Sequence, residues 1–282
     1  MSVAAANGRS AQTGFCPGFR ATDDLLSYLQ SYGLLRTSKV FNTSALVWDP
    51  GPERVLVLAP HMDDETIGCG GALARHARAG ASVHVVFLTD GRHGSGKLAG
   101  LAGEARQAEE RKLIATRKEE ARRALAALGV ADATFLDVED GTLSQDKEVA
   151  RRLRAVLESQ RPELVYVPCF LEQHPDHYAA SRVLLEAARD LPHSFQCVGY
   201  EVWTPLFPNC VVRIDEVVEV KRRALSEYQS QLAELDYMHS GLGLNAYRSA
   251  AFTGNQVRFA EAYCSVPLPE YRAMFEAYRG GA

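Results

Sequence analysis

The sequence predicts an α/β fold with a mostly parallel sheet and helices on both of its faces. Two observations support this prediction. Short apolar runs alternate with longer segments of helical periodicity, which is the pattern of units in which a helix connects two parallel strands. The first four apolar runs are almost continuously hydrophobic, as is typical of strands that are covered on both faces.

The predicted elements follow from these runs and periodicities. The apolar runs predict six strands, at 54–59, 82–89, 133–138, 163–168, 196–202 and 211–214. The helical periodicity predicts helices at 66–79, 104–128, 145–159, 178–190 and 215–236. Two glycine-rich stretches, 90–103 and 239–255, are predicted to be loops that lie where they can close over a ligand.

The helix predicted at 104–128 is densely charged, but Ile114, Ala121, Leu125 and Leu128 form one apolar stripe along it. We interpret its charges as a solvated outer face with ion pairs four residues apart, and not as a nucleic-acid footprint. This interpretation assigns no charge of the helix to a functional site.

The length of 282 residues gives room for one large domain with a full hydrophobic core. No internal repeat and no low-complexity linker divides the chain. We expect residues 46–282 to form a single domain with a C-terminal extension, which wraps back over the sheet after residue 214. Residues 1–45 are expected to be an N-terminal extension, to which the sequence assigns no role.

The charge and the cysteine pattern limit the classes of function. A net charge of −4 provides no overall attraction for nucleic acid or for an anionic membrane. The six cysteines are spread singly, which is typical of reduced thiols in a cytoplasmic protein. No apolar run approaches the roughly 18–20 residues that a membrane span requires. We therefore expect a cytoplasmic protein with a small-molecule partner and no membrane span, either a monomer or a homo-oligomer.

Three carboxylates and an imidazole follow the first predicted strand directly, as His61, Asp63, Asp64 and Glu65. In open α/β sheets, ligands bind beyond the carboxyl ends of the strands. A tight turn can aim His61 and Asp64 at one point, and an imidazole with a carboxylate is a common ligand set for zinc. Asp63 then points elsewhere and is free to act as a base.

Two other interpretations of this segment are weaker. The run from Gly68 to Gly71 before a helix, with Asp90 at the end of the second strand, is similar to a dinucleotide-binding motif. However, Leu73 stands where the third glycine belongs, and a pyrophosphate would face three acidic residues. Acidic residues are also favourable at a helix N-terminus, but one would suffice for that purpose.

A second group of polar residues, His174-Pro175-Asp176-His177, follows the fourth predicted strand and therefore lies at the same edge of the sheet. The proline restricts the residue before it, so the two imidazoles belong to a short rigid unit. His177 would complete a shell of two histidines and one aspartate and leave an open position for water. That arrangement is typical of a catalytic metal site and not of a closed structural one.

Together, the segment 60–71 and the later His-Pro-Asp-His segment resemble the PIG-L/LmbE family of zinc-dependent N-acetyl-sugar deacetylases. The resemblance covers roughly residues 50–265, and it includes the segment 116–130 and the late Ala-Glu-Ala-Tyr at 260–263. It implies a Rossmann-like α/β fold. The two motifs are specific in combination, whereas either alone is much weaker.

The resemblance also implies roles for individual residues. The metal ligands of the family map onto His61, Asp64 and His177, and its general base maps onto Asp63. The first histidine of the second motif, His174, is expected to assist at the oxyanion or at the leaving group.

Further roles are expected for three residues that lie in the two motifs or after the second predicted strand. Asp176 would orient a histidine or stabilise its charge. Glu65 and Arg92 are candidate substrate contacts, since Arg92 follows the second strand and could bind sugar hydroxyls or a phosphate. The sequence departs from the family at Met62, where proline is common, and this departure puts the rigidity of the turn in doubt.

We therefore expect a hydrolase that removes the N-acetyl group from an amino sugar or amino-sugar conjugate, of the N-acetylglucosaminyl type, releasing acetate and a free amine. Zn²⁺ is the expected cofactor, and Fe²⁺, Co²⁺ or Ni²⁺ would also suit such a site. One alternative is an amidase that acts on a thiol conjugate or another N-acyl substrate. The other alternative is a nucleotide-binding module without turnover.

Overall fold

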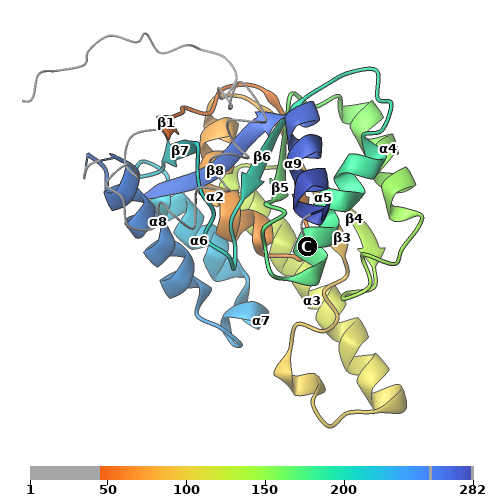
Figure 1. Ribbon diagram of the computed structural model, residues 1–282. Helices are drawn as coiled ribbons and strands as arrows, with labels where there is room; N and C mark the ends of the chain where they lie inside the picture. Colours follow the sequence, from red (N-terminus) through yellow and green to blue (C-terminus); the bar gives the residue numbers. More distant parts are fainter. Residues whose placement is uncertain (1–44, 254–255, 281–282) are drawn as a thin grey trace, which may run out of the picture.

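The computed structural model describes residues 45–253 and 256–280, and Figure 1 shows their arrangement. The N-terminal extension predicted for residues 1–45 lies outside the described residues, except for its last residue. The assignment of residues 46–282 to one domain stays a prediction. Among the described helices, none combines the length and the apolar character needed to cross a bilayer.

The eight strands of the described residues form one sheet in the order β1-β7-β8-β6-β5-β2-β3-β4. All neighbouring strands are parallel except that β8 runs antiparallel to both β6 and β7. The predicted mostly parallel sheet is therefore confirmed. The strands are β1 (Leu46–Val47), β2 (Arg54–Ala59), β3 (Ser82–Thr89), β4 (Asp132–Val138), β5 (Leu164–Pro168), β6 (Gln196–Tyr200), β7 (Cys210–Arg213) and β8 (Ala260–Pro267).

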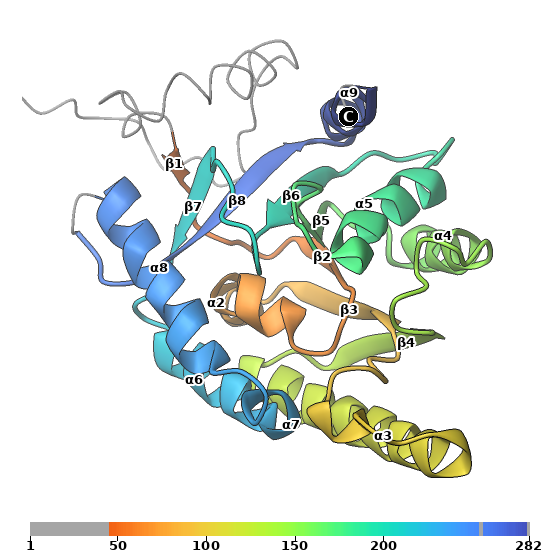
Figure 2. The same cartoon turned by 60° about the horizontal axis from the view of Figure 1, so that its bottom comes forward.

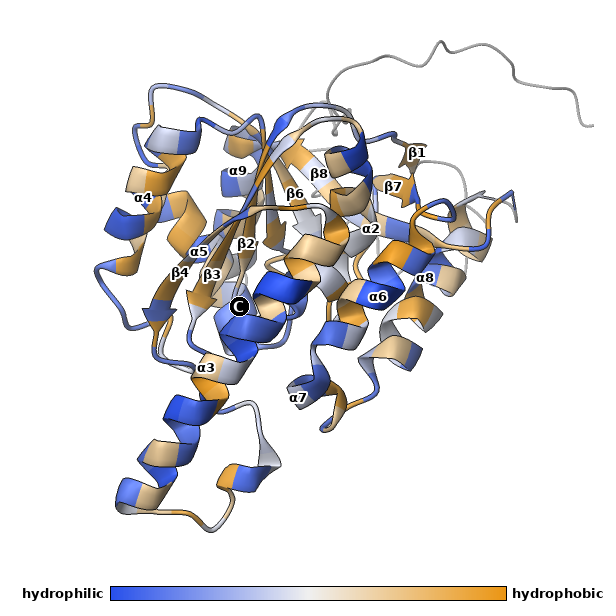
Figure 3. Cartoon of the chain, turned by 180° about the vertical axis from the view of Figure 1, so that it is seen from behind, coloured by the Kyte–Doolittle hydropathy of each residue, from blue (hydrophilic) through white to orange (hydrophobic). Residues whose placement is uncertain are grey.

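Alternate residues of the strands enter two separate hydrophobic cores. Leu56 and Leu58 of β2 pack with α4, α5 and α9, whereas Val55 and Val57 of the same strand pack with α2, α3 and α6. The prediction of helices on both faces is therefore confirmed, and Figure 3 shows the hydrophobic strands between these two layers. The helices are α2 (Asp64–Arg78), α3 (Gly103–Leu128), α4 (Val149–Gln160), α5 (Pro175–Ala187), α6 (Val218–Glu227), α7 (Gln229–Leu232), α8 (Tyr237–Thr253) and α9 (Leu268–Gly280), with a short 3₁₀ helix, η2, at Gly96–Leu98.

The C-terminal part of the chain differs from the prediction in two respects. It contributes a strand to the sheet, because β8 inserts between β6 and β7. The helix predicted at 215–236 is interrupted at Tyr228, whose ψ of 54° lies outside the helical range, and it forms the shorter helices α6 and α7.

The prediction of a loop at 239–255 is wrong, because the helix α8 occupies most of this stretch. Its glycines disfavour a helix in isolation. Its buried face also carries polar side chains, which conceal the helical period when only apolar residues are counted. That face comprises Gly241, Leu242, Asn245, Arg248, Ser249 and Thr253.

The charges of α3 do not all belong to a solvated outer face. Arg117 and Glu120 are buried together with Ala121 and Leu125. The predicted stripe is confirmed at Ala121, Leu125 and Leu128 but not at Ile114, which is only half-buried. The buried face also includes two charged residues that the prediction had placed in solvent.

A buried ion pair joins the C-terminal part of the chain to α2. Lys221 Nζ on α6 lies 2.7 Å from Glu261 Oε1 on β8, and both side chains are fully buried. Glu261 also accepts hydrogen bonds from the backbone N–H groups of Gly71 and Ala72, each at 2.7 Å. Because Asn245 of α8 contacts the same Lys221 at 2.9 Å, one pair connects α2, α6, α8 and β8.

We expect Glu261→Gln to lower the free energy of unfolding by about 3–5 kcal/mol, because it leaves the Lys221 cation buried without its counter-charge. Urea denaturation followed by circular dichroism would measure the change. The control is Glu158→Gln, which removes the exposed partner of Arg154 and should cost less than about 1 kcal/mol. Equal losses in the two variants would contradict the role of the pair.

Candidate active site

The two polar segments lie side by side because β2 and β5 are neighbours in the sheet. The first segment follows β2 and begins α2, and the second follows β5 and begins α5. On its other side β2 pairs with β3, so the strand order reverses at β2. Open α/β sheets bind ligands at such a reversal, and Figure 2 shows the neighbouring positions of β2, β5 and α2.

His61, Asp64 and His177 meet around one carboxylate oxygen, and we call these three side chains the His/Asp triad. Asp64 Oδ2 lies 3.2 Å from His61 Nδ1 and 3.2 Å from His177 Nε2. The backbone N–H of His61 donates to the same oxygen at 2.8 Å. Each of the three predicted ligands therefore directs one donor atom toward a common region.

The protonation of the triad reflects this proximity. Burial disfavours ionisation of Asp64, but the charges of His177 and His61 and their close contacts with Asp64 hold the pKa of Asp64 well below its usual range. Burial also opposes protonation of His177, yet Asp64 raises the pKa of His177 to about 9. Burial is likewise outweighed at His61, where hydrogen bonds to Asp140, Asp176 and Asp64 raise the pKa. A metal ion would displace these protons, because it binds the neutral imidazole.

The ring nitrogens that point away from Asp64 have carboxylate neighbours of their own. His61 Nε2 lies 3.2 Å from Asp140 Oδ1 and 3.5 Å from Asp176 Oδ2. His177 Nδ1 lies 3.7 Å from Glu172 Oε2. Carboxylates in this position fix the orientation and tautomer of metal-binding histidines. The contact of Asp176 agrees with the orienting role predicted for it.

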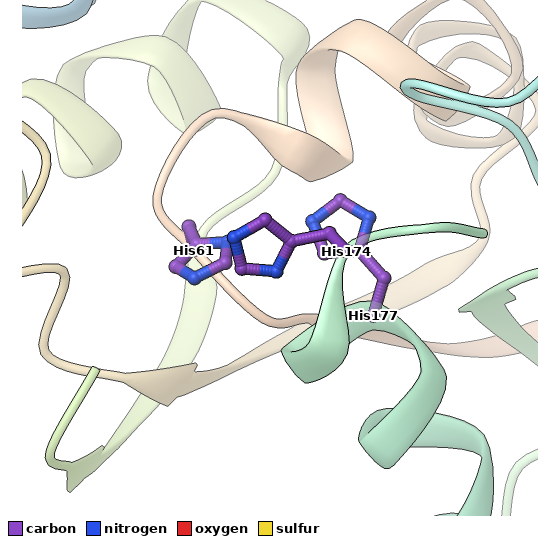
Figure 4. Close-up of side chains that lie close together, drawn as sticks. All are labelled: His61, His174 and His177. Atoms are coloured by element: carbon purple, nitrogen blue, oxygen red, sulfur yellow. The ribbon is translucent and has the colours of Figure 1, made fainter. Parts of the chain in front are cut away.

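His174 caps α5 and stands beside the triad. Its Nδ1 accepts the backbone N–H of Asp176 at 3.2 Å, so a neutral ring carries its proton on Nε2. Burial, with the positive charges of His61 and His177, lowers the pKa of His174 and favours this neutral form. Its ring centroid lies 4.8 Å from that of His61 and 4.9 Å from that of His177. Figure 4 shows the three rings close together.

Asp63 has a strained backbone. Its φ of 143° lies in a region that glycine adopts freely and other residues rarely adopt. Arg117 holds the turn, since it donates to the Met62 carbonyl at 2.9 Å and lies 3.4 Å from Asp63 Oδ1. Met62 itself is fully buried in the core, so the turn is fixed without the proline that the family commonly has. Burial raises the pKa of Asp63, although the charge of Arg117 opposes this effect.

Glu65 lies behind the site, where it is fully buried. It accepts the backbone N–H of Asp63 at 3.2 Å, the hydroxyl of Tyr228 at 2.5 Å, and the hydroxyl of Thr66. Burial raises the pKa of Glu65 to about 7. These contacts support the backbone of the turn, and the structure gives no support to the predicted substrate contact.

A cavity of about 210 Å³ opens beside the triad, and Asp63, His174, Trp203 and Tyr237 are among the residues that line it. Arg92, which was also predicted to contact the substrate, is not among them.

The Arg92 guanidinium is bonded to Asp90 at 2.6 Å and lies 3.2 Å from Glu139. The next residue, His93, lines the cavity in its place. The structure therefore gives the predicted substrate contact of Arg92 no support.

The donor atoms around the cavity fit a divalent metal ion. Among the described residues, two sets bring three donor atoms within 4.8 Å of one another: His61 with His174 and His177, and His61 with Asp140 and Asp176. In the triad, Asp64 Oδ2 lies 3.2 Å from a nitrogen of each histidine. Neither ring nitrogen of the buried His177 makes a hydrogen bond of good geometry within the described part of the chain, although Asp64 and Glu172 lie 3.2 and 3.7 Å away. Nε2, which faces Asp64, is therefore available to a metal ion. The structure therefore contains a His/Asp group that can bind a metal ion.

The glycines at 68–71 are explained by packing. They lie inside α2 and not in a loop before a helix. A Cβ atom at Gly68 would lie 2.2 Å from the Tyr200 ring, and one at Gly71 would lie 2.5 Å from Ile214. Because these residues are enclosed, the segment does not form the exposed phosphate-binding turn of a dinucleotide site.

Three residues near the triad were not predicted. Arg117 lies four positions before Ala121, so extending the apolar stripe backwards would have placed it on the buried face. Asp140 follows the third predicted strand and thus shares the sheet edge with both motifs. Glu172 carries no such signal, because its contacts depend on the fold of the segment after β6.

Comparison with known proteins agrees with this geometry. A family model described as GlcNAc-PI de-N-acetylase (PIG-L) matches residues 56–188. The diacetylchitobiose deacetylase of Thermococcus kodakarensis is 33% identical over 202 residues, which is 64% of this chain and 71% of that protein. The match to the family model includes both motifs and the segment between them.

Two solved structures share the fold. The N,N′-diacetylchitobiose deacetylase of Pyrococcus horikoshii is 22% identical and has a TM-score of 0.64, with coverage of 90% of this chain and 96% of that one. The 4-carboxy-2-hydroxymuconate hydratase of Pseudomonas putida is 25% identical and has a TM-score of 0.63, with coverage of 75% and 95%. From the matched segment and the relative of Thermococcus kodakarensis, we conclude that this chain belongs to the PIG-L family.

Proposed function

We propose that this chain is a metal-dependent hydrolase that removes the N-acetyl group from an amino sugar or amino-sugar conjugate, releasing acetate and a free amine. One observation carries the proposal: a candidate base, Asp63, and a hydrogen-bond donor, His174, line the same cavity as His61 and Asp64 of the triad, with the buried His177 lying 3.2 Å from Asp64. The similarity to a diacetylchitobiose deacetylase supports an amino-sugar substrate.

We further propose that His61, Asp64 and His177 hold Zn²⁺, with Fe²⁺, Co²⁺ or Ni²⁺ as alternatives. Two imidazole nitrogens and one carboxylate oxygen suit zinc and leave a position for water. When bound, such an ion supplies Lewis acidity beside the substrate carbonyl and lowers the pKa of water. Asp176 would keep His61 oriented for this purpose.

The residues of the chain then have separate tasks. Asp63 takes the proton of the attacking water as the general base. His174 donates its Nε2–H to the oxygen on which negative charge develops in the tetrahedral intermediate. The proton held by Asp63 passes to the departing amine. Arg117 keeps Asp63 in place by fixing the backbone of the turn.

Two other reactions would use similar groups. An amidase could act on a thiol conjugate or another N-acyl substrate, and one protein of similar fold is a hydratase. Acetate release from N-acetylglucosamine, diacetylchitobiose and an N-acetylated mercapto conjugate would separate the two hydrolases. A hydratase would release no acetate from any of them.

The proposed partner is a small-molecule amino sugar, and we propose a cytoplasmic location. Cys69, Cys169 and Cys197 are buried free thiols, in agreement with a reducing compartment. We also propose that residues 46–282 form one domain, since the eight described strands belong to one sheet.

We expect Asp63→Asn to lower kcat for deacetylation by about 10²–10⁴-fold, which is the range for a general base, while the metal content stays unchanged. Acetate release from diacetylchitobiose and elemental analysis of the dialysed protein would measure the two effects. Asp132→Asn, a change at an exposed aspartate on β4, is the matched control. If Asp63→Asn keeps full activity, Asp63 is not the base.

The metal content of variants distinguishes a metal site made of the His/Asp triad from one made of His61, His174 and His177. We expect His177→Ala to lose its metal on dialysis, because it removes a ligand. His174→Ala should retain the metal and lose about 10²–10³-fold in kcat, as when a donor to an oxyanion is removed. Metal analysis that finds the reverse order would show that His174, and not His177, is a ligand.

A further inference from the structure

Two cavities share a wall at the mouth of the site. The cavity beside the triad has a volume of about 210 Å³, and a second cavity next to it has a volume of about 170 Å³. Ile67, Val202, Trp203 and Tyr237 line both of them. The shared wall is therefore apolar and largely aromatic, whereas acidic and imidazole side chains surround the triad.

Trp203 is more exposed than a residue of the hydrophobic core. Its side chain is 48% exposed, and its ring packs edge-on against Tyr237, with centroids 5.8 Å apart. A large ring that stays in solvent beside a cavity offers apolar area to a ligand, and its indole N–H offers a hydrogen bond.

The backbone that carries this ring is held in place by Glu172. The buried Glu172 carboxylate accepts the N–H groups of Val202 at 2.6 Å, Trp203 at 3.0 Å and Thr204 at 3.2 Å. The same carboxylate lies 3.7 Å from His177 Nδ1. One side chain thus fixes the position of the aromatic wall relative to the triad.

We propose that Trp203 and Tyr237 form a stacking surface for a pyranose ring of the substrate, and that the second cavity receives the neutral substituent carried by that ring. The inference rests on the proposed deacetylase function. The C–H faces of a sugar pack against an aromatic ring while its hydroxyl groups keep their hydrogen bonds, so an apolar wall beside a polar cavity suits such a ligand.

The second cavity suits a neutral group because its charged residue is already paired. Both carboxylate oxygens of Glu201 are bonded to Arg248, at 2.9 and 2.6 Å, and one also accepts the N–H of Leu206. Leu235 and Leu244 supply apolar surface to the same cavity. The substrate class is therefore a neutral glycoside of the amino sugar, such as a disaccharide, and not a phosphorylated sugar.

The two tryptophans of the chain allow a direct binding test. Trp48 is only 5% exposed, so acrylamide quenches the fluorescence of Trp203 preferentially. In the Asp63→Asn protein loaded with Zn²⁺, diacetylchitobiose should protect Trp203 from quenching more strongly than N-acetylglucosamine does. With Trp203→Phe added, the remaining fluorescence should not respond to either sugar.

Kinetics provide the second test. Trp203→Ala should raise the KM for diacetylchitobiose about tenfold, equivalent to about 1.4 kcal/mol of binding. Its kcat should change by less than about twofold, because stacking remote from the reacting bond contributes equally to the ground and transition states. Trp203→Phe should recover most of the loss. Tyr247→Ala, at an exposed aromatic residue that lines neither cavity, should leave KM unchanged.

The outcomes separate this inference from the proposed function. Acetate release with an unchanged KM in Trp203→Ala, or no protection of Trp203 by diacetylchitobiose, would overturn the stacking surface and leave the deacetylase intact. If protection of Trp203 increases with the length of the N-acyl chain and not with the addition of a second sugar ring, the aromatic wall binds the acyl group. That result would also overturn the stacking surface. No metal-dependent acetate release from any sugar would count against the deacetylase, whereas the quenching experiment would still test the wall.

Discussion

The parallel pairing of β2 with β5 is the constraint on which the site depends. Val55 pairs with Leu164 and Val57 with Tyr166, so the segments after the two strands leave the sheet side by side. A shift of one residue would exchange the faces of every side chain in a strand. Because both faces of the sheet are packed in hydrophobic cores, the cores fix the register, and the register fixes the distance between Asp64 and His177.

Three buried ion pairs surround this part of the sheet. The α3, α6 and α8 helices each bring one buried cation toward an acidic partner, in the pairs Arg117 with Asp63, Lys221 with Glu261, and Arg248 with Glu201. Removal of one partner would cost about 3–5 kcal/mol, because the other charge would be left buried without compensation. The two pairs of the C-terminal part therefore add no net charge beside a site whose proposed ligands come from the N-terminal half and from α5.

The sequence predicted those features that are marked both by residue type and by position along the chain. Six of the eight described strands, most helices and the meeting of His61, Asp64 and His177 could be predicted, because continuous apolar runs mark buried strands and polar residues at their carboxyl ends share one edge. The strands β1 and β8 were not predicted. The helical state of 239–253 could not, since its buried face is made of residues such as Asn245 and Arg248, whose partners lie on distant elements. Glu172 was missed for the same reason, as its three N–H donors come from the segment after β6.

At Asp63, the backbone conformation lowers the stability of the fold, whereas the side chain is the proposed catalytic base. A residue other than glycine pays about 1–3 kcal/mol for such a conformation, which glycine adopts without that cost. The contacts of Arg117 and Glu65 hold the aspartate there against this preference. A laboratory selection for heat resistance alone would therefore favour exchange of the aspartate for glycine, so thermostable variants of this chain need a simultaneous selection for turnover.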